Sequence, residues 1–289
     1  MTGHGTRGRS GRRRAHGWLA IVLLASCTGA SPAPAAPAPA VRASAARPLA
    51  FGETFTIESR VLGETRTINV YRPPVWDDTL AAPRPVLYMP DGGVGEDFLH
   101  VAGLLQVSVG NGSMRPVLLV GVENTERRRD LTGPTRNPKD REIAPRVGGS
   151  AAFRRFLREE LMPVVNARWR TTGETALMGE SLAGLFVVET LFEEPESFDS
   201  YVAIDPSLWW NDSALVTAPL PAAARGRTLW LASSSEPTIA RLTARLAARL
   251  QDAPGLAASH TPMPAETHAT IYHPAALQAV RRIFHPEAP

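Results

Sequence analysis

The chain lacks several features that would fix its class from composition alone. Its 289 residues contain one cysteine, Cys27, so no disulfide can form within the chain. The apolar run near the N-terminus, residues 18–24, is too short to span a bilayer as a mature helix. There is no internal repeat. A disulfide-stapled scaffold, a repeat array and a bilayer span at this run are therefore excluded.

The chain also lacks a net positive charge once its N-terminus is set aside. The formal net charge is +3, and five arginines precede Cys27 with no acidic residue among them. Removing these five charges leaves about −2, so the basic character belongs to the N-terminal segment. We therefore expect no nucleic-acid partner.

The first 26 residues are typical of a signal peptide, with a basic start followed by the apolar run. The tetrapeptide Leu-Ala-Ser-Cys at residues 24–27 is similar to a bacterial lipobox, which makes Cys27 the predicted lipidated first residue. Cleavage by ordinary signal peptidase in the Ala-rich segment that follows is the alternative. A paired-arginine export signal fits the residues after Arg13 poorly. We expect an exported protein on the periplasmic or cell-envelope side, held to the membrane only by this lipid anchor.

A tether is predicted to follow the anchor. Between residues 31 and 46 proline and alanine alternate, which favours extended polyproline conformations and cannot bury a core. We assign residues 27–47 to the lipidated cysteine and tether, and residues 48–289 to one folded domain. Near 240 residues is a normal size for a single α/β domain.

Residues 175–188 (Thr-Ala-Leu-Met-Gly-Glu-Ser-Leu-Ala-Gly-Leu-Phe-Val-Val) carry the strongest chemical signal. A short apolar run, a serine between small residues and an apolar helical run predict a nucleophile elbow, which exposes Ser181 above a sheet. The pattern is G-x-S-x-A, so Ala183 adds one methyl group to a crowded turn. The alternative is a helix N-terminus with Ser181 as an ordinary cap.

The rest of the domain predicts an α/β fold with a mostly parallel central sheet. Residues 51–57 and 65–71 alternate apolar and polar side chains, as an antiparallel N-terminal pair with one wet face does. Continuous apolar runs at 86–89, 116–122, 201–204 and 228–232 indicate buried strands. Helical spacing at residues 98–107, 151–165 and 275–283 predicts helices on both faces of the sheet.

Two polar segments are expected beside the serine. A glycine-rich loop follows the strand at residues 86–89, and its amides, at Gly92 or Gly93, would join that of Leu182 in an oxyanion hole. A simple turn is the alternative. The polar stretch at residues 125–150 is predicted to be a substrate-side loop or a solvated flap. Its arginines, Arg127 and Arg129 in particular, are candidates for binding anionic or oxygen-rich groups.

Two adjacent tryptophans, Trp209 and Trp210, follow the strand at residues 201–204. Ligands bind at the carboxyl edge of α/β sheets, so these rings are candidates to line a cleft. Core packing is the competing interpretation, and we expect one ring in each role.

A serine nucleophile needs a base and a group that orients the base. In this fold the order along the chain is serine, acid, histidine, with the histidine before the last helix. His268 fits this place and is preferred over His273. Glu236 is the preferred acid because it follows a late strand; Asp205, Asp212 and a Ser-His dyad without an acid remain open.

Several motifs together resemble a known family. They are the segments at residues 87–93, at 121–124 with the Arg-Arg-Arg-Asp-Leu-Thr run 127–132, at 179–181 and at 203–210. In this order they resemble the putative-esterase branch of the α/β-hydrolases, which includes esterase D-like and siderophore (enterochelin-type) esterases. The similarity covers roughly residues 50–285.

The resemblance implies an α/β-hydrolase fold and carboxyl-ester hydrolysis of a small-molecule ester, with no metal and no cofactor. It also implies that Ser181 is the nucleophile and His268 the base, with some siderophore esterases working as a dyad. Two alternatives stay open from sequence. An acyltransferase would pass the acyl group to an alcohol instead of water, and a non-catalytic lipoprotein would only bind a ligand in the cleft.

Overall fold

The computed structural model describes residues 43–75 and 82–286. The predicted signal peptide, Cys27 and most of the predicted tether lie outside these residues. The chain divides into an N-terminal unit, Met1–Pro48, and a compact unit, Leu49–Pro289. Within the described ranges, no helix is both long and apolar enough to cross a membrane.

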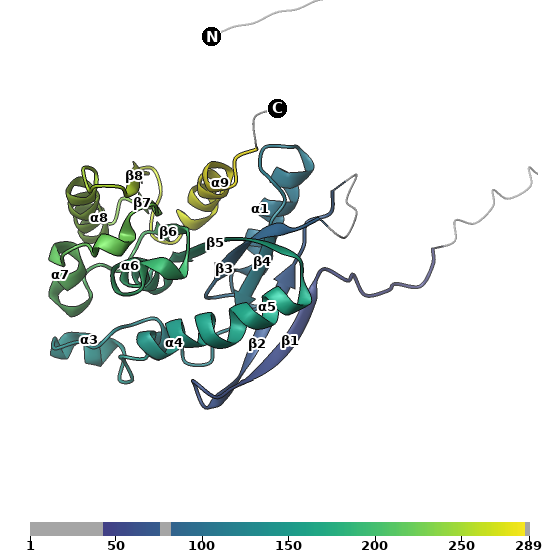
Figure 1. Cartoon of the computed structure of the whole chain (residues 1–289), viewed down its shortest axis with the longest axis horizontal. Helices are drawn as coiled ribbons and strands as arrows, with labels where there is room; N and C mark the ends of the chain where they lie inside the picture. Colours follow the sequence, from purple (N-terminus) through teal and green to yellow (C-terminus); the bar gives the residue numbers. More distant parts are fainter. Residues whose placement is uncertain (1–42, 76–81, 287–289) are drawn as a thin grey trace, which may run out of the picture. The chain divides into compact units, whose positions relative to one another are not determined.

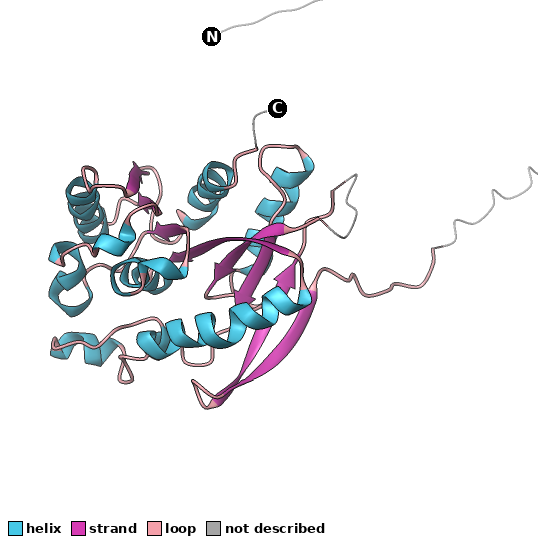
Figure 2. Ribbon diagram, viewed as in Figure 1, coloured by secondary structure: helices cyan, strands magenta, loops and turns pink. Residues whose placement is uncertain are grey.

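The compact unit is built on one mixed sheet in the order β1-β2-β4-β3-β5-β6-β7-β8. β1 pairs antiparallel with β2, and β2 pairs antiparallel with β4, whereas the remaining pairings are parallel. The predicted α/β class, the antiparallel N-terminal pair and the parallel remainder are confirmed (Figures 1 and 2). The strands are β1 (Glu53–Ser59), β2 (Glu64–Tyr71), β3 (Arg84–Met89), β4 (Leu118–Val122), β5 (Thr171–Glu180), β6 (Ser200–Ile204), β7 (Thr228–Ser233) and β8 (Ala257–Pro262).

Helices cover both faces of the sheet, as predicted. On one face α1 (Phe98–Gly110) and α9 (Tyr272–Ile283) pack on alternate strand residues such as Leu87 and Met89. On the other face α4 (Ser150–Phe156), α5 (Met162–Arg168), α6 (Leu182–Glu193) and α8 (Pro237–Leu250) pack on the opposite set, including Val86 and Tyr88. Figure 1 shows α1 and α9 on the other side of the sheet from α4 and α5. Burial on both faces explains the uninterrupted apolar runs of the central strands.

Three segments depart from the sequence-based picture. The polar stretch at 125–150 contains two short helices, α2 (Arg127–Asp130) and α3 (Pro138–Ile143). The predicted helix at 151–165 is interrupted by a π-helical turn, Leu157–Leu161, between α4 and α5. Strand β8 lacks a strong apolar pattern because its residues are only half buried at the sheet edge. Short or half-buried elements carry weak periodicity, which is why the sequence did not reveal them.

The segment after the two tryptophans has an unusual backbone. In α7 (Trp210–Thr217), Asn211, Asp212 and Ser213 have φ values of 49°, 56° and 62°. Three consecutive non-glycine residues in the left-handed region are energetically unfavourable. Contacts with the 125–150 stretch stabilise them: Asp140 accepts a hydrogen bond from the Asn211 amide at 2.8 Å, and Asn211 accepts one from the Arg136 amide at 3.0 Å.

Candidate active site

The elbow at Ser181 has the backbone geometry that its sequence predicts. Ser181 lies between β5 and α6 with φ 60° and ψ −119°, a conformation rare for a residue with a side chain. A Cβ atom at Gly179 would lie 2.6 Å from the Cβ of Ala183, and one at Gly184 would lie 2.9 Å from the carbonyl oxygen of Ile204. Glycine is therefore required at both positions, while the methyl group of Ala183 is accommodated.

His268 lies beside this serine. Its Nε2 atom is 3.1 Å from the Oγ of Ser181, and its Nδ1 atom is 2.6 Å from the Oδ2 of Asp205. Asp205 is fully buried at the end of β6, and it accepts two hydrogen bonds from Ser234, at 2.6 Å from the amide and at 2.8 Å from the hydroxyl. The side chain of His268 is 42% exposed, so the ring faces solvent beside the serine. Serine, imidazole and a fixed carboxylate thus form a continuous hydrogen-bonded relay.

Glu236, the acid preferred from sequence, is placed differently. It is the N-cap residue of α8, and its Oε2 atom accepts a hydrogen bond from the Ile239 amide at 2.6 Å. The carboxylate that contacts His268 directly is Asp205, one of the alternatives. Glu236 is followed by Pro237 at the first helical position, a helix-start signal that competes with any role at the histidine. The preference for Glu236 is corrected to Asp205 on this geometry.

Two of the three other histidines that follow the elbow, His260 and His273, have their partners elsewhere. His260 is on β8, where its Nε2 atom is 2.9 Å from the Oγ of Ser233. His273 packs against His100, with ring centroids 4.9 Å apart. The structure therefore places His268, the histidine preferred from sequence, next to Ser181.

Protonation in the relay is set by burial and by these hydrogen bonds. The hydrogen bond to Asp205 raises the pKa of His268, and burial opposes that rise. Burial acts to raise the pKa of Asp205, but the hydrogen bonds from His268 and Ser234 outweigh it and hold this pKa below its ordinary value. Asp205 is therefore ionised at neutral pH and can stabilise a charged imidazolium.

A second carboxylate also reaches the histidine. The Oε1 atom of Glu180, the last residue of β5, is 3.4 Å from the Nδ1 of His268. Burial raises the pKa of Glu180 to about 7, although His268 and Arg127 act in the opposite direction. Sequence reasoning did not single out Glu180, because the second position of G-x-S-x-A is not constrained by the turn.

The backbone amides predicted to form the oxyanion hole differ in the hydrogen bonds that they make. Leu182 is the first residue of α6, where backbone amides have no intrahelical acceptor. The Gly92 amide donates to the carbonyl of Val122 at 2.9 Å, so this amide belongs to the backbone packing of the loop. The Gly93 amide donates to the Oε2 of Glu96 at 2.7 Å, a side chain that a substrate could displace. Of the two glycines, Gly93 fits the predicted role and Gly92 does not.

The glycine-rich loop is held by a small polar cluster around Asp91. Arg127 binds Asp91 through two hydrogen bonds, at 2.7 and 2.8 Å, and Asn124 donates to both Asp91 and Glu96 at 2.6 and 2.9 Å. Asp91 itself has φ 55°. Arg127 thus supports this loop, and its charge also acts on Glu180.

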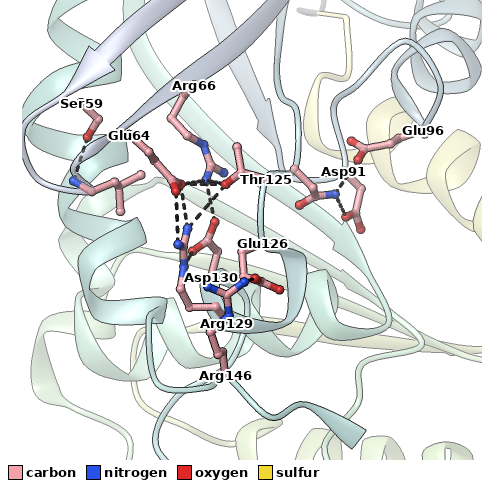
Figure 3. A network of polar contacts seen from close by, with 12 residues as sticks. Ser59, Glu64, Arg66, Asp91, Glu96, Thr125, Glu126, Arg129, Asp130 and Arg146 are labelled. Carbon is pink, nitrogen blue, oxygen red and sulfur yellow. Dashed lines mark hydrogen bonds and ion pairs between the residues drawn. The ribbon is translucent and has the colours of Figure 1, made fainter.

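Arg129 lies in a separate ion network (Figure 3). Its guanidinium donates to Asp130 at 2.6 Å and to Glu64 at 2.7 Å. Arg66, fully buried, donates to the same two carboxylates and to Thr125. With its donors bound inside this network, Arg129 is not placed to bind a substrate, and we assign it to the network instead.

The two tryptophans differ in environment. Trp210 is buried, and its Nε1 donates to the carbonyl of Gly133 at 3.1 Å. It borders a cavity of about 250 Å³ that Leu185 and Glu189 also line. Trp209 is half buried. Trp210 therefore has the packing role, and Trp209 is the ring that remains available to a ligand.

Glu180, Asp205 and His268 also form the kind of grouping that could hold a metal ion, since one ligand atom of each lies within 4.8 Å of the others. The relay to Ser181 accounts for this arrangement, because Nδ1 of His268 is already bound by Asp205. We assign no metal to it.

A serine, a histidine and a buried aspartate at a strand–turn–helix elbow, on a mostly parallel sheet, define an α/β-hydrolase. Within this class, the chain belongs to the putative esterase family, whose model matches residues 59–254. The resemblance expected from the motifs is confirmed.

Named relatives include siderophore esterases. The chain is 32% identical over 182 residues to the siderophore triacetylfusarinine C esterase of Aspergillus fumigatus, covering 58% of this chain and 60% of that protein. It is 30% identical over 165 residues to the ferri-bacillibactin esterase BesA of Bacillus subtilis, covering 51% of this chain and 56% of that protein. The matches thus span about 60% of the length of these relatives.

Solved structures give the same fold. An IroE-like serine hydrolase from Shewanella oneidensis aligns with a TM-score of 0.71 and 28% identity, covering 81% of this chain and 80% of that one. The enterobactin esterase FES from Shigella flexneri aligns with a TM-score of 0.66 and 19% identity, covering 83% and 60%. The second likeness concerns the fold alone.

Proposed function

We propose that this protein is a serine carboxylic-ester hydrolase that works through an acyl enzyme. The observation that carries the proposal is the Ser181–His268–Asp205 relay, with 3.1 and 2.6 Å between the interacting atoms. Family membership supports the same reaction class.

The steps follow from this geometry. His268 Nε2 takes the proton of Ser181 as its Oγ attacks the ester carbonyl, and the amides of Leu182 and Gly93 stabilise the resulting oxyanion. The protonated imidazole, stabilised by Asp205, then donates its proton to the leaving alcohol. Water, activated by His268, attacks the acyl group on Ser181, and the acid product leaves with the serine restored.

The Gly93 amide is occupied in the free protein. Its hydrogen bond to Glu96 must be exchanged for one to the substrate oxygen before the oxyanion hole is complete. An oxyanion-hole donor contributes on the order of 3 kcal/mol to the transition state, so this exchange affects turnover.

We propose siderophore esters, among small esters, as the substrate class. The names of the two curated relatives describe esterases of triacetylfusarinine C and ferri-bacillibactin, which supports this choice. A screen of siderophore esters against activated short-chain esters tests it. Equal turnover of an acyl-matched simple ester would argue for a broader esterase.

We also propose that the protein is exported and anchored through lipid on Cys27, as the N-terminal pattern predicts. Mass spectrometry of the protein expressed in a bacterial host tests this. A diacylglycerol-modified N-terminal Cys27 is the expected result, and an unmodified N-terminus within the Ala-rich segment would contradict it.

The catalytic proposal is tested with a fluorophosphonate probe. We expect an adduct on Ser181 by peptide mapping, and no adduct in Ser181→Ala or His268→Ala. Ser207→Ala is a matched control: the Ser207 hydroxyl shares a 3.5 Å hydrogen bond with that of Ser181 but does not join Ser181 to His268, so the adduct on Ser181 should persist. Full ester turnover by a folded Ser181→Ala variant would reject the proposal.

A further inference from the structure

The histidine of the relay has two carboxylates at the same nitrogen. Asp205 Oδ2 is 2.6 Å and Glu180 Oε1 is 3.4 Å from the Nδ1 of His268. They reach the ring from different elements, since Asp205 follows β6 and Glu180 ends β5. A relay needs only one acid, so the second carboxylate requires its own explanation.

The two carboxylates are held differently. Asp205 is fully buried and fixed by the two hydrogen bonds from Ser234. Glu180 has a side chain 16% exposed, and within the described part of the chain its ion pair with His268 is the contact that its carboxylate makes. Asp205 is therefore a permanent anion, while the charge of Glu180 depends on its surroundings.

The groups whose charges act on Glu180 come from four parts of the fold. They are His268, Arg127 on α2, Asp205 and Asp97 at the start of α1. Burial is the largest influence and raises the pKa of Glu180 to about 7; the cations lower it and the two aspartates raise it. The histidine responds in turn, because Asp205, Glu180 and Glu236 all act to raise the pKa of His268.

We propose that Glu180 is a positioning residue, a second acid at the Nδ1 of His268 that supports the imidazolium during ester hydrolysis. The inference rests on the proposed function. When Ser181 loses its proton to Nε2, the ring carries one positive charge and both its nitrogens carry protons. Asp205 accepts a hydrogen bond from the Nδ1–H and stays ionised, and ionised Glu180 adds a second negative charge to the same side of the ring.

This role depends on pH in a defined direction. At low pH Glu180 is neutral and contributes little, so the protein behaves like one that lacks this charge. As pH rises through about 7, Glu180 ionises and the imidazolium becomes more stable. Because the two groups interact, the pH dependence belongs to the pair.

The test compares kcat/KM of wild type and Glu180→Gln from pH 5.5 to 8.5. We expect a ratio near 1 at the acid end that rises to about three- to tenfold at the alkaline end, equivalent to a change of ~0.5–1 pK unit. Glu53→Gln, which removes an exposed carboxylate from the far edge strand β1, is the matched control and should give a ratio of 1 throughout. A uniform fall across all pH values, or no change, would overturn the inference.

A second arm uses the Asp205→Asn background. There the remaining carboxylate at Nδ1 is Glu180, so adding Glu180→Gln should cost more than it does in wild type. Equal costs in the two backgrounds would contradict a shared role. A readout without catalysis is the NMR titration of the His268 ring in Ser181→Ala, whose pKa should fall when Glu180→Gln is added; an unchanged pKa would also overturn the inference.

These outcomes separate the two proposals. An inactive Ser181→Ala with an unaltered pH profile in Glu180→Gln would reject the role of Glu180 and leave the esterase intact. An active, unlabelled Ser181→Ala would reject the esterase mechanism itself.

Discussion

Two glutamates in this fold, Glu64 and Glu180, lie in clusters of charged side chains, and their pKa values are shifted in opposite directions. Burial acts to raise the pKa of both. At Glu64, hydrogen bonds from Arg129, Thr125 and Arg66 outweigh burial and lower the pKa to about 2. At Glu180 burial prevails and raises the pKa to about 7.

The difference lies in the number of donors. Glu64 accepts hydrogen bonds from two guanidinium groups and a hydroxyl, as the network in Figure 3 shows. Glu180 faces one half-exposed imidazole at 3.4 Å. The carboxylate of Glu64, with several hydrogen-bond donors, keeps its charge and stabilises the N-terminal side of the sheet. The carboxylate of Glu180 at the elbow has fewer partners, so its charge can change with pH. The ion network around Glu64 is therefore structural, whereas the cluster around Glu180 belongs to the candidate active site, although both are rich in charge.

The largest expected effect comes from removing the carboxylate that contacts His268, and it tests whether Asp205 is the acid of the relay. Asp205→Asn should lower kcat by about 10²–10⁴-fold, because the buried carboxylate stabilises the imidazolium and fixes its tautomer. Glu236→Gln should change kcat by less than about threefold, since Glu236 caps α8. Kinetics on an activated ester with both variants measures this. A larger loss in Glu236→Gln than in Asp205→Asn would restore Glu236 as the acid.

The next prediction removes Arg66 from the ion network of Figure 3. Arg66 is 0% and Asp130 1% exposed, and the two are 2.6 Å apart. Arg66→Met should lower the free energy of unfolding by about 1.5–3 kcal/mol, because the buried carboxylate of Asp130 loses one of its two guanidinium partners and keeps only Arg129. Urea denaturation measures the loss.

Arg158→Met is the control for that experiment. Arg158 is 46% exposed in its ion pairs with Glu159 and Glu194, so its removal should cost less than about 1 kcal/mol. Similar losses in the two variants would show that the network of Figure 3 contributes no more than a surface pair.

A third prediction uses stability against pH. The folded pKa of Glu64 is lowered, so its stabilisation is complete above about 4.5 and is lost as pH falls toward about 2. Glu64→Gln should therefore destabilise the protein by about 1–3 kcal/mol at pH 7 and by progressively less below pH 4.

Glu180 should show the reverse. Its folded pKa is raised, so ionisation costs stability, beginning above about 4.5 and complete above about 7. Glu180→Gln should thus raise stability by on the order of 1 kcal/mol at pH 8 and leave it unchanged at pH 4. Thermal melts across this range measure both variants. Parallel curves for the two would contradict the opposite pKa directions.

The smallest expected effect concerns the blocked amide. Glu96→Ala removes the carboxylate that accepts the Gly93 hydrogen bond and should raise kcat by about two- to threefold. Glu123→Ala, beside the same glycine but without that hydrogen bond, is the control. Steady-state kinetics measures the change, and a fall in kcat would mean that Glu96 positions the loop more than it blocks the amide.

Much of the fold and the central pair of the site could be predicted from the sequence. Buried parallel strands have continuous apolar runs, and the elbow combines such a run with small residues around Ser181. His268 followed from its place before the last helix. Each of these signals lies within a short stretch of residues, so one amino-acid sequence is enough to detect them.

The acid and the arginines depend on geometry that is not local. Asp205 and Glu236 both follow strands at the carboxyl edge, and only the direction of each side chain separates them. Arg127 and Arg129 are two residues apart on a short helix and point to different clusters, at Asp91 and at Glu64. Sequence spacing predicted their neighbourhood but not their partners.

The crowding at the elbow affects how such sites are found in sequences. Gly179 and Gly184 meet the neighbouring backbone closely, whereas position 183 has room for a methyl group. A search pattern written from packing would thus require two glycines five residues apart around the serine, with any small residue directly before the second. Such a pattern would retrieve chains like this one, which the G-x-S-x-G form passes over.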